Sequence, residues 1–161
     1  YLFKRKIDEG GYKKNRITSF NHDSKKAYVQ DFTEQKDTSV AFVNVQDMMS
    51  SFYFLRNIET KNLVKGDEIK LDIFMDSQVY PFKLRFLGKE VLKTNFGKVN
   101  TLIFRPIVQS GRVFKEQESV TLWITDDANK IPIKMGASLR VGSLIAELEG
   151  YRGLANPFQS F

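Results

Sequence analysis

The sequence IKLDIFMDSQVYPFKLRF, residues 69–86, determines the fold class. Before Asp76-Ser77, apolar residues at positions 69, 71, 73 and 75 alternate with other residues. After this pair, apolar and aromatic residues at positions 80, 82, 84 and 86 alternate with Pro81, Lys83 and Arg85. Alternation with period two is typical of a β-strand with one buried face. The stretch therefore predicts two strands that are joined by a short turn.

The same pattern extends over most of the chain. Turn signals such as Gly10-Gly11, Leu87-Gly88-Lys89 and Asp126-Asp127-Ala128-Asn129 separate the alternating runs. About ten strands with turns at this spacing are typical of an antiparallel meander, barrel or sandwich. We expect a mainly β fold, a curled antiparallel sheet or half-barrel, in a single domain over residues 1–161.

One segment, residues 46–58, departs from this pattern. Its apolar residues follow the three-to-four spacing of a helix: Met48, Met49, Phe52, Leu55 and Ile58. Asp47 is placed to cap the first turn, and Arg56 near the end complements the helix dipole. We expect one amphipathic helix here, with its apolar side against the concave face of the sheet, which wraps it.

Composition excludes several kinds of site. The chain has 161 residues, no Cys and one His. Disulfides, thiol nucleophiles, Cys-based zinc sites and sites that need several imidazoles are therefore excluded. No glycine-rich phosphate loop or calcium-binding loop is present either. We expect no catalytic constellation, no metal site and no cofactor.

The net charge of +6 is concentrated near the beginning of the chain. A basic segment can attract phosphates or anionic lipids, but Lys residues on an edge strand also discourage aggregation. Without a nucleic-acid-binding consensus or a basic helix, we expect a solvated sheet edge and no nucleic-acid partner. No apolar run reaches the length of a transmembrane helix, so we expect no transmembrane segment.

Aromatic residues are abundant: the chain contains 14 Phe, six Tyr and one Trp. Alternation places Val120, Leu122 and Ile124 on one strand face and Trp123 on the other. Two interpretations stay open for the large apolar residues: they fill a core, or they line a hollow between helix and sheet that binds an apolar ligand. The candidate lining residues are Met48, Phe52, Leu55, Phe82, Phe86, Phe104 and Trp123.

Short motifs are spread along nearly the whole chain: Gly10-Gly11-Tyr12, Val45-Gln46-Asp47, the run from Ser50 to Arg56, Thr94-Asn95-Phe96-Gly97, Phe104-Arg105-Pro106, the run from Leu122 to Asp127, Ile131-Pro132, and the run from Val141 to Leu148. Together they resemble the motifs of a family of exported bacterial proteins, domain-of-unknown-function family 3108. The resemblance implies a periplasmic or other envelope location in a Gram-negative cell, and no established activity. By analogy of fold, such proteins look like half-barrel carriers of lipoproteins. The start at Tyr1 resembles the interior of a strand, so we expect that a preceding segment has been removed.

The sequence is compatible with three candidate functions. The first is a non-enzymatic exported protein that binds a lipid or acyl chain in the hollow. The alternative is an interaction module that binds an envelope protein or glycan through the basic N-terminal hairpin and exposed tyrosines. The third, a hydrolase, would require the carboxylates of Asp126, Asp127 and Glu147 to converge.

Overall fold

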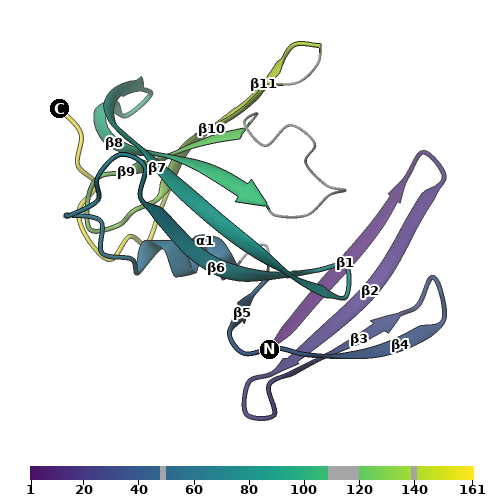
Figure 1. Cartoon of the computed structure of the whole chain (residues 1–161). Helices are drawn as coiled ribbons and strands as arrows, with labels where there is room; N and C mark the ends of the chain where they lie inside the picture. Colours follow the sequence, from purple (N-terminus) through teal and green to yellow (C-terminus); the bar gives the residue numbers. More distant parts are fainter. Residues whose placement is uncertain (48–49, 109–119, 139–140) are drawn as a thin grey trace. The chain divides into compact units, whose positions relative to one another are not determined.

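The computed structural model of the chain describes residues 1–47, 50–108, 120–138 and 141–161. These residues form a mainly β structure with one short helix, α1, at Ser50–Arg56 (Figure 1). The strands are β1 Leu2–Glu9, β2 Tyr12–Asn21, β3 Lys26–Asp31, β4 Lys36–Ala41, β5 Val45–Gln46, β6 Glu68–Met75, β7 Gln78–Thr94, β8 Gly97–Val108, β9 Val120–Thr125, β10 Pro132–Ser138 and β11 Ser143–Glu147. The predicted mainly β, antiparallel fold is confirmed.

The described strands form two open sheets where the sequence predicted one. The order is β1-β2-β3-β4 in one sheet and β11-β10-β9-β8-β7-β6-β5 in the other. Neighbours in each sheet follow one another in the sequence, as the short turns predicted. The break falls after β4 because β5 pairs with β6, in parallel, through Val45 and Asp72.

By its internal contacts the chain divides into two compact units. Unit 1 contains residues 1–51 and 71–80, and unit 2 contains residues 52–70 and 81–161. Strands β6 and β7 contribute residues to both units. This division does not test whether the chain folds cooperatively, so the single domain stays a prediction.

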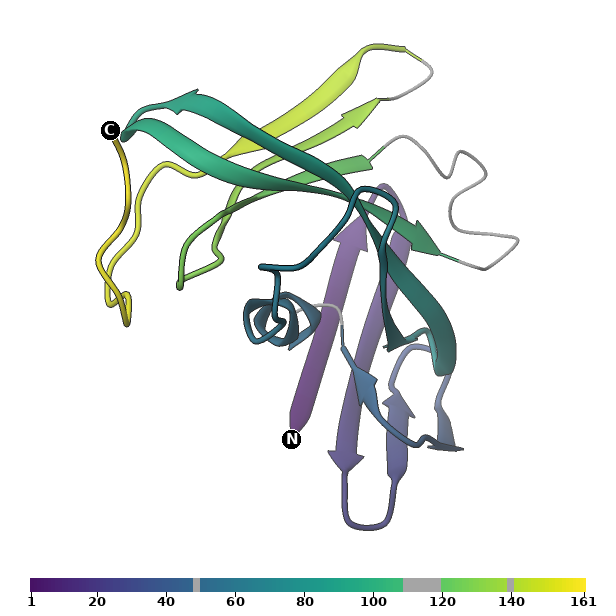
Figure 2. The same cartoon turned by 60° about the vertical axis from the view of Figure 1, so that its left-hand side comes forward.

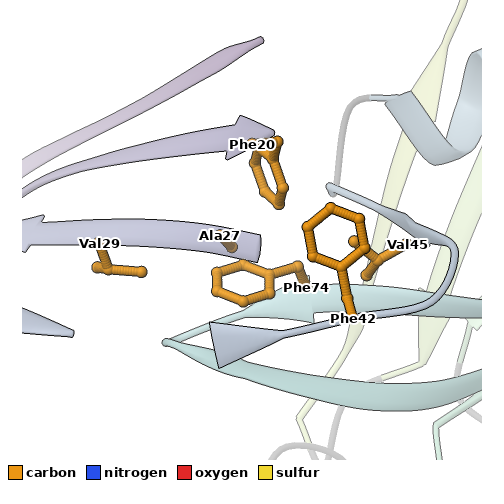
Figure 3. Close-up of a cluster of buried hydrophobic side chains, with 6 residues drawn as sticks. All are labelled: Phe20, Ala27, Val29, Phe42, Val45 and Phe74. Atoms are coloured by element: carbon orange, nitrogen blue, oxygen red, sulfur yellow. The ribbon is translucent and has the colours of Figure 1, made fainter. Parts of the chain in front are cut away.

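The core of unit 1 is aromatic (Figure 3). Phe20 lies edge-on to two other rings, with centroid distances of 5.2 Å to Phe74 and 6.1 Å to Phe42. Val29 and Val45 complete this cluster from β3 and β5. Each fully buried side chain of this size stabilises the folded chain by about 2 kcal/mol, so the cluster fixes both sheets within the unit.

An ion-pair network lies on the same unit, in the first half of β2 and at the end of β3. The Asp31 side chain is 5% exposed and accepts hydrogen bonds from Nε and Nη2 of Arg16 at 2.9 and 2.6 Å. Lys14 Nζ lies 3.2 Å from the same carboxylate. Burial alone raises the pKa of Asp31, but the bonds from Arg16, the Glu34 amide and Lys14 outweigh it and hold the pKa well below its ordinary value.

The turn between β6 and β7 is tied into this network. Asp76 and Ser77 have φ angles of 49° and 64°, as a tight two-residue hairpin turn requires. The Asp76 carboxylate accepts a hydrogen bond from Arg5 at 2.7 Å and a longer one from Arg16 at 3.4 Å. Unit 1 contains nine basic and nine acidic residues, so the basic N-terminal segment is neutralised within its own unit.

Helix α1 is shorter than the predicted segment, residues 46–58. Val45–Gln46 is strand β5, and residues 57 and 58 form a turn after the helix. The Asp47 cap is confirmed: its carboxylate accepts the Ser50 amide at 2.9 Å, and Ser50 Oγ accepts the Asp47 amide at 2.9 Å. Met48 and Met49 lie outside the described residues.

The predicted turn at Leu87-Gly88-Lys89 is wrong, because β7 continues through it to Thr94. The pairing of β7 with β8 shifts register between Phe86 and Gly88, and Gly88 has a φ of 131°. A bulge of this kind bends a strand without ending it, and glycine adopts that backbone conformation at least cost.

A buried asparagine in unit 2 anchors the C-terminal segment. Asn129 is 1% exposed, and its Nδ2 donates to the carbonyls of Asn156 and Pro157 at 3.1 and 3.3 Å. Its Oδ1 accepts the Asn156 amide at 3.2 Å. Farther along, Phe161 and Lys98 exchange two backbone hydrogen bonds of 3.0 Å. The segment is therefore part of the folded unit.

We predict that Asp31→Asn lowers the free energy of unfolding by about 3 kcal/mol at neutral pH, because the largely buried Arg16 and Lys14 lose the one buried carboxylate that they share and keep only more exposed partners. Asp37→Asn, an exposed residue of the same sheet, makes the same chemical change and is expected to have little effect. Because the pKa of Asp31 is lowered in the folded state, the stabilisation is present above the unfolded value of about 4 and is lost below it. Urea titrations over a pH series measure the free energies of unfolding. If the difference between the wild type and Asp31→Asn does not become smaller in acid, the ionised Asp31 carboxylate is not the stabilising group.

We predict that Asn129→Ala releases the C-terminal segment and costs about 1–3 kcal/mol, because the backbone of Asn156 and Pro157 loses three hydrogen bonds to this buried side chain. Trypsin should then cleave after Arg152 faster than in the wild type, as mass spectrometry of the fragments measures. Asn100→Ala, on an exposed side chain of β8, is the control. Equal cleavage rates in both variants would show that Asn129 does not hold the segment.

Candidate functional site

The sheet of unit 2 has an inner face that is strongly apolar. Buried side chains on this face come from the three strands β7, β8 and β9: Leu84, Phe86, Leu102, Phe104, Leu122 and Ile124. The register pairs Phe86 with Phe104 and Phe104 with Leu122, and the two phenyl centroids lie 5.3 Å apart. In Figure 2 these strands curve toward the side on which α1 lies. The inner face is therefore the place where the predicted hollow must be sought.

Four of the seven candidate residues meet on the inner face. Phe86 and Phe104 belong to the buried cluster, and Leu55 and Phe82 pack against it while partly exposed. Leu55 shows that the helix packs against this face, as predicted. Met48 lies outside the described residues, and so does the side chain of Phe52. The near-complete burial of Phe86 and Phe104 agrees with the interpretation of these rings as core.

Trp123 lies on the outer face, opposite the buried cluster. Its indole Nε1 donates a hydrogen bond to Oε1 of Glu90, and Lys134 Nζ lies 5.8 Å from the ring centroid. Gly136 lies against the ring, where a Cβ would meet it at 3.5 Å. Alternation along β9 had already separated Trp123 from its neighbours, so the structure does not place it with the other candidate residues.

The inner face continues beyond the buried cluster onto β10 and β11. The register pairs Leu122 with Met135, and Val120 with Ala137. In turn, β11 places Ala146 opposite Met135 and Leu144 opposite Ala137. Because paired residues share a face, these side chains extend the same apolar surface. We call this set the apolar strip: Val120, Met135, Ala137, Leu144 and Ala146.

The apolar strip is open to solvent where the cluster is not. Met135 is 36% exposed and Leu144 is 52% exposed, against 2% for Phe104. Sequence reasoning missed the strip, although the alternation of the last strands contains it. Alternation along a strand identifies its apolar face, but it does not indicate which part of that face is buried in the folded chain. The strip is an exposed apolar surface that adjoins a packed core.

A hollow of about 250 Å³ lies between the end of β7 and the β10–β11 pair. Lys93, Lys134 and Glu147 contribute to its lining, and Lys134 and Glu147 are themselves joined at 3.0 Å. Its polar groups do not suit an acyl chain.

The carboxylates considered for a hydrolase have separate local partners. Asp126 pairs with Lys89 at 2.8 Å. Asp127 accepts the amides of Asn129 and Lys130 at 2.9 and 3.0 Å, which is the turn-forming role expected of it. Glu147 is held on β11 by Lys134. Among the described residues, no group of three or more His or acidic side chains is arranged to hold a metal ion.

The described part of the chain contains no helix that is long and apolar enough to cross a bilayer. No curated protein and no solved structure matches the sequence. A family model does match, over residues 1–149: Protein of unknown function (DUF3108). This match covers all the described strands and the helix, and it agrees with the motifs that suggested the resemblance. The chain therefore belongs to the DUF3108 family.

Proposed function

We propose that this protein is a non-enzymatic binding protein of the cell envelope that holds an acyl chain, of a lipid or a lipoprotein, on the inner face of the unit 2 sheet. The observation that carries the proposal is the continuity of the apolar strip with the buried cluster. The periplasmic or exported location is part of the proposal and rests on what the family resemblance implies.

Exposure and charge both support an amphiphilic ligand. Met135 and Leu144 are exposed, and a ligand that covers them gains about 25 cal/mol of binding free energy for each Å² of apolar surface removed from water. Unit 2 contains 16 basic and 10 acidic residues, and so carries the whole excess of positive charge. A positive unit with an open apolar strip suits an acyl chain that carries an anionic head group.

The absence of an enzyme activity is likewise a proposal. It is supported by the local pairing of Asp126, Asp127 and Glu147, which accounts for each carboxylate without a substrate. An activity screen on purified protein against ester and glycoside substrates is the direct check.

The alternative function, an interaction module for an envelope protein or glycan, has one specific observation in its favour. Tyr12 and Tyr28 are 56% and 46% exposed on unit 1, whose Lys4, Lys6 and Lys13 also face solvent. Lys14, which the sequence grouped with them, is 12% exposed and bound to Asp31 and Glu34, so it is not available. This alternative predicts that reversing the charge of Lys4, Lys6 and Lys13 abolishes recovery of the partner, with palmitate binding unaffected.

The test of acyl binding compares two variants, each of which adds one negative charge to a different face of β10. Met135→Asp places a carboxylate in the apolar strip, whereas Ser138→Asp places it on the outer face of β10. Both variants change the net charge equally, so long-range repulsion of an anionic ligand is matched. We expect palmitate to bind the wild type, Met135→Asp to weaken binding at least about tenfold, or about 1.4 kcal/mol, and Ser138→Asp to leave it nearly unchanged.

Calorimetric titration with palmitate measures the affinities, and native mass spectrometry gives the stoichiometry. Thermal unfolding of both variants checks that they are folded. Absence of palmitate binding by the wild type, or equal weakening by the two substitutions, would overturn the proposal.

A further inference from the structure

Strand β11 forms one edge of the seven-stranded sheet. In the part of the chain that the structure describes, it pairs with β10 alone, from Ser143 opposite Ser138 to Glu147 opposite Lys134. Its second row of backbone amides and carbonyls therefore faces away from the sheet. Such a row is a template for another strand.

The side chains of β11 are exposed on both faces of the sheet. All five residues from Ser143 to Glu147 are exposed, and Leu144 and Ile145 are 52% and 58% exposed. Three consecutive positions, Leu144, Ile145 and Ala146, are apolar. A strand that is apolar, uncovered and unpaired on one side is what edge protection in natural sheets normally avoids.

The other sheet edges of this protein are protected. On β1, Lys4 and Lys6 are exposed, and β4 begins with the exposed pair Lys36 and Asp37. The opposite edge of the seven-stranded sheet, β5, has only two residues. Charge and shortness are both devices against strand addition. Among the four edges, β11 alone has a purely apolar centre, and this difference needs an explanation.

We propose that β11 is a self-association edge: it pairs in antiparallel fashion with β11 of a second copy of this chain, about a two-fold axis at Ile145. In this register Ile145 lies opposite its own symmetry mate on the outer face. Leu144 lies opposite Ala146, and Ser143 lies opposite Glu147, so apolar residues meet and no two like charges oppose. A second copy fits this edge because the five-residue sequence is complementary to itself.

Closure also favours this occupant. Pairing β11 with a different edge of another molecule would leave a free β11 at each step and produce an open assembly. Antiparallel pairing of β11 with itself consumes both edges at once and stops at two molecules. Joining five residues buries well under the roughly 1,200 Å² of a standard interface, so the dimer is weak and concentration-dependent.

This inference does not depend on acyl binding. Leu144 and Ala146 of the apolar strip also pair across the proposed dimer, but the dimer is tested at the outer-face residue Ile145 and the ligand site at Met135 on the inner face. The two tests can therefore fail separately.

Sedimentation velocity of the purified chain over a concentration series tests the proposal. The wild type is expected to shift reversibly from monomer to dimer as concentration rises. Ile145→Lys and Ile145→Glu each place like charges opposite one another at the two-fold axis, and each is expected to stay monomeric. Val141→Lys, at a residue that is 91% exposed and outside the strand, is the matched control and is expected to dimerise like the wild type.

Mixing the two charged variants gives the decisive measurement. Only if Ile145 meets its own symmetry mate does an equimolar mixture of Ile145→Lys and Ile145→Glu recover the dimer that each lacks alone. Circular dichroism of both variants confirms that they remain folded. A wild type that is monomeric at its highest soluble concentration, dimers that persist in both variants, or a mixture that stays monomeric would each overturn the proposal.

Discussion

The pairing of β7 with β8 determines which side chains of unit 2 meet, and the other features of that unit depend on it. Phe86 lies opposite Phe104, and both point to the inner face. Because side chains alternate strictly along a strand, a slip of β7 by one residue would move Phe86 to the outer face and leave Phe104 without its partner. The bulge at Gly88 absorbs one residue and so keeps the alternation compatible with a long, bent β7. The cluster on which Leu55 packs depends on this register, and the pairings of β9, β10 and β11 extend the same face into the apolar strip.

Period-two alternation made the fold class and many of the strands predictable from the sequence. It also separated Trp123 from Leu122 and Ile124 correctly, although the tally of large aromatics had grouped Trp123 with the candidate hollow. Alternation was the better guide because it reflects backbone geometry, whereas residue size does not say which face a side chain occupies. The misread turn at Leu87-Gly88-Lys89 has a related cause, since glycine permits a bulge as readily as a turn.

Long-range pairing is what the sequence could not provide. Asp76 lies 71 residues from Arg5 and 60 from Arg16, so its part in neutralising the basic N-terminal segment has no local signal. The same holds for the division into two sheets, which depends on β5 pairing in parallel with β6. Asp47, by contrast, was correctly predicted as a cap because its partner, Ser50, is three residues away.

The two proposed surfaces of unit 2 differ from its core in burial, and burial is a tertiary property. Leu144 and Phe104 share the inner face and have similar apolar character, yet only Phe104 is covered. Likewise, the alternating pattern of the last strand is the same whether that strand lies at an edge or in the middle of a sheet. The buried cluster ends at β9, and Ile133 at the start of β10 is still covered. Beyond it, β10 and β11 present apolar side chains to solvent, Met135 and Leu144 on the inner face and Ile145 on the outer face. The other described sheet edges are protected by charge or by shortness. Exposed apolar side chains on β10 and β11 are therefore best explained by a ligand or another strand that covers them.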